Sequence, residues 1–96
     1  MKNIDVELYL SQLINFFEKN PNDLIDLIGD SLKEDFYGKV EEQCYKNYEN
    51  GDEISLTQKQ IINIVLELKN ETPKNLIEEK VHGVFQHTKF GVISLN

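Results

Sequence analysis

The sequence contains a single cysteine and no arginine, tryptophan or alanine, and these shortages restrict what the chain can do. Cys44 alone cannot form a disulfide within the chain or supply a thiolate zinc site. A nucleophilic thiol needs a nearby base and a cationic setting that lowers its pKa. Glu41 and Glu42 precede Cys44 instead, so we interpret it as a half-buried structural residue.

The charge of the chain is strongly one-sided. Seventeen acidic residues against ten lysines give a formal net charge of −7. Arginine supplies the planar, bidentate contacts with which proteins read guanine and hold phosphate, and the chain has none. The lysines are scattered among acids and form no basic run. We therefore expect no direct binding of DNA or RNA.

The sequence also lacks long apolar runs and a targeting signal. The first residues, MKNIDVELYLSQ, carry three charged side chains and no uninterrupted apolar stretch, unlike a secretory signal. No later stretch approaches the roughly 20 apolar residues that a membrane-spanning helix needs. The sequence therefore predicts a cytoplasmic chain with no membrane partner.

Motifs for catalysis and for metal binding fail when their spacing is tested. Glu78, His82 and His87 could face one site, but zinc catalysis needs three ligands with tighter spacing than these have. The acidic loop 47–53 lacks the ligand pattern of a calcium-binding loop. There is no glycine-rich phosphate loop and no serine elbow. We predict no enzyme, no metal and no cofactor, and a small enzyme or ligand site at His82 or His87 is an alternative.

The most apolar and most clearly delimited stretch is 56–70, which reads LTQKQIINIVLELKN. Thr57 and Gln60 have the spacing of a capping box, in which each side chain binds the backbone N–H of the other residue. Apolar residues then recur at helical spacing and cover roughly 200° of the helix at about 100° per residue. They are Ile61, Ile62, Ile64, Val65, Leu66 and Leu68. This width predicts a core helix with neighbours on two sides.

Capping residues, proline and glycine divide the first part of the chain into two further helices. Asn3 or Asp5 can cap a first helix that ends near Lys19. Asn20-Pro21 opens a second, short helix, because proline fits the first helical position well. Gly29 ends it by adopting a left-handed conformation.

Similar signals predict the remaining helices. Ser31 and Glu34 have capping-box spacing at the start of a long helix that Asn50-Gly51 ends. Gly38 lies within this helix, where we predict a close approach of a second helix. Thr72-Pro73 opens a last helix that runs to about Lys80.

The C-terminal stretch changes in composition to β-branched and aromatic residues, and Gly83 and Gly91 interrupt a helix there. We predict a strand at 84–86, a turn at 87–89 and a strand at 90–95. A lone two-stranded hairpin is marginally stable in water. This one would therefore pack on the helices or pair with a second copy of the chain.

Together these patterns predict a mainly α fold. Residues 1–96 would form a single domain of four to five helices, with a short C-terminal β-hairpin or extended tail over 84–96. For function we predict a small protein-interaction module that binds a protein partner or a second copy of itself, as a homo-oligomer. Two features favour it: the unpaired edge of the hairpin and the tyrosines of the long helix.

The predicted interface combines the tyrosines of the long helix with apolar residues of the tail. Its residues are Tyr37, Tyr45, Tyr48, Phe85, Phe90, Val92 and Ile93. An alternative function is an acidic decoy that occupies the nucleic-acid-binding surface of another protein, which the net charge of −7 would suit.

Overall fold

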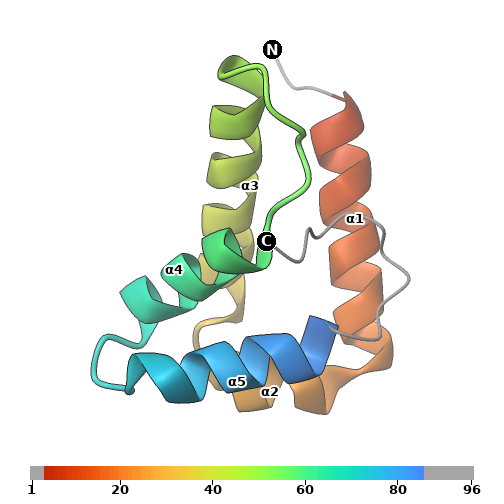
Figure 1. Ribbon diagram of the computed structural model, residues 1–96. Coiled ribbons are helices and arrows are strands. Elements are labelled where there is room, and N and C mark those ends of the chain that lie inside the picture. The colour runs from red at the N-terminus through yellow and green to blue at the C-terminus, as the bar shows by residue number, and fades with distance from the viewer. Residues whose placement is uncertain (1–3, 86–96) are drawn as a thin grey trace.

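The computed structural model describes residues 4–85, and these residues form five α-helices (Figure 1). The helices are α1 (Ile4–Lys19), α2 (Pro21–Ile28), α3 (Lys33–Glu49), α4 (Gln58–Leu68) and α5 (Lys74–Phe85). The mainly α fold class predicted from the sequence is therefore confirmed.

The helices pack as two crossed pairs joined by α4. In Figure 1, α1 and α3 lie side by side and run in opposite directions, and α2 and α5 lie together across one end of this pair. Helix α4 leads from α3 to α5 and contacts both, and it also contacts α2. Every helix therefore has at least two helical neighbours, and a single apolar core forms between them.

Helix α4 is the core helix that the sequence predicts. The capping box at its start is formed: the Gln60 N–H donates to Thr57 Oγ1 over 3.1 Å, and the Thr57 N–H donates to Gln60 Oε1 over 3.1 Å. Ile61, Ile64 and Val65 are buried behind it. Because the apolar face is wide, the helix can pack against α3 and α5 at the same time.

An aromatic cluster lies where α1, α3 and α5 meet. The ring of Phe17 is 5.1 Å from that of Phe16, 6.1 Å from that of Phe36 and 6.0 Å from that of Phe85, measured between centroids. Phe17 meets each of the three rings edge-on, a geometry that aromatic pairs prefer because the positive ring edge faces the negative ring face. The cluster joins three helices that are far apart in sequence.

A pair of amide side chains, one buried and one half-buried, joins the end of α3 to the start of α4. Asn47 is 3% exposed, and its Nδ2 donates to Gln60 Oε1 over 3.2 Å. Gln60 Nε2 and Gln43 Nε2 each donate to Asn47 Oδ1 over 3.0 Å. Since Gln60 also belongs to the capping box, one side chain fixes both the start of α4 and its position against α3.

Two buried tyrosine hydroxyls differ in their hydrogen bonding. Tyr9 Oη accepts a hydrogen bond of 3.3 Å from the N–H of Leu56, which fixes the loop before α4 against α1. Burial raises the pKa of Tyr9, so this hydroxyl stays protonated. Among the described residues, the buried hydroxyl of Tyr37 has no hydrogen-bond partner. Burial and then the negative charge of Glu18 raise the pKa of Tyr37.

The predicted strand at 84–86 is wrong for its first two residues, because α5 continues to Phe85. Gly83 is exposed within this helix and costs only about 1 kcal/mol relative to alanine. Burial of Val81 and Phe85 on one helical face contributes about 1.5–3 kcal/mol each and outweighs that cost. Residues 86–96, with the rest of the predicted hairpin and extended tail, lie outside the described residues.

Two predictions about α3 are also wrong. The helix begins at Lys33 with Leu32 at the N-cap, which makes no side-chain cap, so the predicted box of Ser31 and Glu34 is not formed. Leu32 packs against the core, and burial of a leucine outweighs the roughly 1 kcal/mol of a cap. Gly38 is exposed, and no neighbouring atom lies within 4 Å of where its Cβ would be, so no helix approaches it closely.

We expect the substitution Tyr9→Phe to lower the free energy of unfolding by about 1–3 kcal/mol, because the Leu56 N–H would be buried without its acceptor. Tyr37→Phe is the matched control. It removes a buried hydroxyl that makes no hydrogen bond among residues 4–85, so it should be neutral or stabilising. Urea unfolding followed by circular dichroism measures both. Equal destabilisation of the two variants would contradict this account.

We expect Asn47→Asp to destabilise the protein by about 1–3 kcal/mol at neutral pH, because a carboxylate cannot donate to Gln60 Oε1. Burial raises the pKa of the introduced carboxyl, so the loss should be small at low pH and grow as the pH rises through that pKa. Asn63→Asp, at an exposed site on α4, should change the stability by less than about 0.5 kcal/mol. Thermal unfolding across a pH series tests this, and a pH-independent loss would be the opposing result.

Candidate binding cleft

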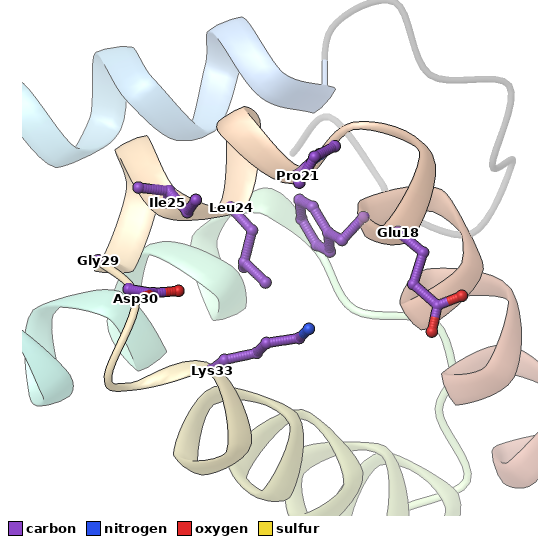
Figure 2. A pocket seen from close by; sticks show the side chains of 8 residues that line it. Glu18, Pro21, Leu24, Ile25, Gly29, Asp30 and Lys33 are labelled. Atoms are coloured by element: carbon purple, nitrogen blue, oxygen red, sulfur yellow. The ribbon is translucent and has the colours of Figure 1, made fainter.

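A cleft lies where the end of α1, all of α2 and the start of α3 meet, and Figure 2 shows it from close by. Its volume is about 220 Å³. The residues that line it are Phe17, Glu18, Pro21, Leu24, Ile25, Gly29, Asp30 and Lys33. Apart from the turn glycine, it therefore combines apolar side chains with three charged ones.

Two sharp turns in the chain create this cleft. Pro21 is the first residue of α2, and the side chain of Asn20 turns back to donate to the Phe16 carbonyl over 2.9 Å. At the other end, the Gly29 N–H donates to the Ile25 carbonyl over 2.7 Å. Gly29 has φ 78° and ψ 174°, a conformation that essentially only glycine adopts. The helix breaks predicted at both positions are thus confirmed, and α2 is joined to α1 by one residue and to α3 by residues 29–32.

The floor of the cleft is part of the hydrophobic core. Phe17 is only 2% exposed and Leu24 is also buried, so both are held by packing on their far sides. Ile25 is different, because 45% of its surface is exposed. An apolar group entering the cleft would therefore meet a rigid floor and cover Ile25 at the edge.

Charged side chains form the rim. Figure 2 shows Lys33 extending from the first turn of α3 across the opening, with Glu18 on one side of it and Asp30 on the other. Within residues 4–85, Lys33 forms no ion pair with either carboxylate. The rim thus carries two negative charges and one positive charge. Within the described residues, none of the three is part of an ion pair.

A second, smaller hollow between α3 and α4 is polar. It has a volume of about 90 Å³. Lys39 Nζ lies 2.9 Å from Glu67 Oε1, and Lys46 Nζ lies 3.5 Å from Glu42 Oε1. The ion pair with Glu67 raises the pKa of Lys39. Lysines alternate with acids on this face, so it does not present the single-sign stripe that an acidic decoy would need.

The four predicted interface residues that the structure describes differ in how accessible they are. Tyr37 and Tyr45 are half-buried against the core, and only Tyr48, at 55% exposure, is largely accessible. Phe85, also predicted as an interface residue, is buried in the aromatic cluster. The other three predicted interface residues, Phe90, Val92 and Ile93, lie outside the described residues.

The described candidate catalytic and metal-binding residues lie on two helices, α3 and α5. Cys44 is buried, and burial followed by the negative charge of Glu41 raises its pKa to about 12. His82 and Glu78 are exposed on α5, and His87 lies outside the described residues. Within 4–85, no group of three or more side chains is placed to hold a metal ion.

Comparison of the chain with protein-family models, with curated proteins and with solved structures found no match. In the part of the chain that the structure describes, no helix has both the length and the apolar character needed to cross a bilayer.

Sequence reasoning did not find the cleft. Its residues are spread over three helices, and their apolar members have the ordinary spacing of core residues. One signal was present: two helix breaks, Asn20-Pro21 and Gly29, lie only eight helical residues apart. A helix as short as α2 cannot fill all of the space beside both of its neighbours, the end of α1 and the start of α3.

The Cys44 thiol should resist labelling in the folded protein. At about pH 8, a disulfide reagent should react with it far more slowly than with the urea-unfolded chain, because burial suppresses the reactive thiolate. The same shift should lower the free energy of unfolding as the pH rises from 9.0 to about 12, since the unfolded thiol ionises first. Absorbance of the released reagent measures the rate. Equal rates for the two forms would show that the thiol is accessible.

Proposed function

We propose that this chain is a protein-interaction module that binds an apolar side chain of a partner protein in the cleft between α1, α2 and α3. The observation that carries the proposal is the open apolar floor of Phe17 and Leu24 beside the exposed Ile25. Concave apolar sites with a few convergent polar groups are the usual form of binding sites in proteins.

The size of the cleft favours a side chain over a cofactor. At about 220 Å³ it exceeds a cavity of about 150 Å³, which can hold a benzene molecule. It is smaller than the roughly 300–1,000 Å³ of pockets that bind drug-sized molecules. One leucine, phenylalanine or similar side chain from a partner is therefore the best match.

A single anchor of this kind gives weak binding. Burial of one apolar side chain contributes about 1.5–3 kcal/mol, and even a millimolar complex requires about 4 kcal/mol. The charged rim must therefore contribute as well, and we expect a transient interaction with a small interface.

A second copy of the chain is the other partner that the sequence predicts. That prediction depends on pairing between hairpins, and α5 now includes residues 84 and 85 as helix. Among the described residues, the exposed large apolar side chains Leu8, Ile25, Tyr48 and Leu76 lie on four different helices. The cleft therefore gives better support for binding a different protein, and homo-oligomer formation stays a prediction for light scattering to test.

A displayed library of random peptides, selected on the immobilised protein, tests the proposal. We expect the enriched peptides to contain an apolar anchor, and Ile25→Asp to weaken their binding by about tenfold or more, because a charge at the cleft edge would have to be desolvated. Fluorescence anisotropy of the labelled peptides gives the affinities.

Leu76→Asp is the matched control for this experiment. Leu76 is 41% exposed on α5, against 45% for Ile25, and does not line the cleft. Both variants should keep the wild-type unfolding transition, since both positions are on the surface. If the two variants bind equally well, or if no peptide is enriched, the cleft is not a protein-binding site. If Ile25→Asp alone converts a dimer to a monomer, its partner is a second copy.

A further inference from the structure

The segment that forms the cleft, residues 18–35, is the source of a local excess of negative charge. It contains six carboxylates and two lysines. The carboxylates are Glu18, Asp23, Asp26, Asp30, Glu34 and Asp35. All of them are exposed except Asp23, which is half-buried. This part of the surface is therefore much more acidic than the face of α3 and α4 on which lysines alternate with acids.

Two carboxylates at the rim differ from two on the α3–α4 face in how they are paired. On the α3–α4 face, Glu67 and Glu42 form ion pairs with lysines. At the cleft, Glu18 and Asp30 form no such pair with the nearby Lys33 within the described chain. Their negative charge is therefore available to a ligand seated in the cleft, at separations well inside the screening length of about 8 Å.

The lysines near the cleft do not cancel the net negative charge of its rim. Lys33 is the only cation among the lining residues, and it stands between two acids. Lys80 reaches α2 from α5, but its Nζ donates to the backbone carbonyl of Asp26 over 3.0 Å, not to a carboxylate. An anionic group entering the cleft would meet Lys33 but would be repelled by Glu18 and Asp30. A cationic group would be attracted by these two carboxylates.

Building on the proposed protein-interaction function, we propose that the cleft recognises a basic segment of a partner protein, in which an apolar anchor is flanked directly by lysine or arginine. The anchor packs on Phe17 and Leu24, and the flanking cation is paired by Glu18 or Asp30. Lys33 rotates away from the opening when the cation arrives, because its long side chain is exposed and unpaired in the described chain. Complementary charge at the rim mainly increases selectivity and the rate of association.

Three labelled peptides of about three helical turns test this proposal. All three carry Leu and Phe at helical spacing, and the remaining positions are Lys, Gln or Glu. We expect the Lys peptide to bind about tenfold more tightly than the Glu peptide at low ionic strength, and this ratio to shrink as salt is added. Fluorescence anisotropy measures each affinity.

Two double variants show whether the attraction is local. Glu18→Gln with Asp30→Asn should weaken binding of the Lys peptide about fivefold or more. Asp52→Asn with Glu53→Gln removes the same charge from the exposed loop before α4. This variant should change the affinity by less than about twofold, because distant charges are screened by salt. Equal losses in the two double variants would overturn the proposal, because the attraction would then be a general effect of net charge.

The Gln peptide separates failure of this inference from failure of the proposed function. If it binds and Ile25→Asp abolishes binding, while Lys and Glu peptides bind equally, the cleft is a protein-binding site without charge selectivity. If none of the three peptides binds in a way that Ile25→Asp weakens, both proposals are wrong.

Discussion

The packing of Phe17 determines both the fold and the position of the cleft. Its ring contacts Phe16 on its own helix, Phe36 on α3 and Phe85 on α5, at centroid distances of 5.1–6.1 Å. It also lines the cleft. Because packed interiors are as dense as organic crystals, a ring held by three others cannot shift freely. The floor of the cleft is therefore as rigid as the core of which it is part.

Features that depend on residues close in sequence were predictable. The capping box of Thr57 and Gln60 involves groups three residues apart, and the breaks at Asn20-Pro21 and Gly29 follow from backbone sterics of single residues. The wide apolar face of α4 likewise indicated that this helix packs against neighbours on two sides. These signals require no knowledge of the neighbouring helices, so a single sequence is sufficient to detect them.

Features decided by competition between local preference and burial were not predictable. Ser31 does not cap α3, because the packing of Leu32 stabilises the observed helix start more than the cap would. Gly83 does not end α5, because the burial of Phe85 stabilises the continued helix. The partners of these apolar side chains lie on other helices, where sequence spacing gives no guide. The cleft is a further case. Its walls are core residues, and only the arrangement of three helices leaves a space between them.

The combination of a rigid floor and an adaptable rim has a consequence for how the cleft would bind. Phe17 and Leu24 are already ordered by the core, so a partner's anchor would not have to order them, and binding would lose little conformational entropy at the floor. Lys33 is long and exposed, and its side chain has about 2 kcal/mol of rotamer entropy. A partner that displaces Lys33 would therefore change the conformational entropy of this side chain. Affinity for the anchor would thus be set by shape, whereas the choice between partners would be set by the charges of the rim. The two properties are located on different residues and can therefore change independently.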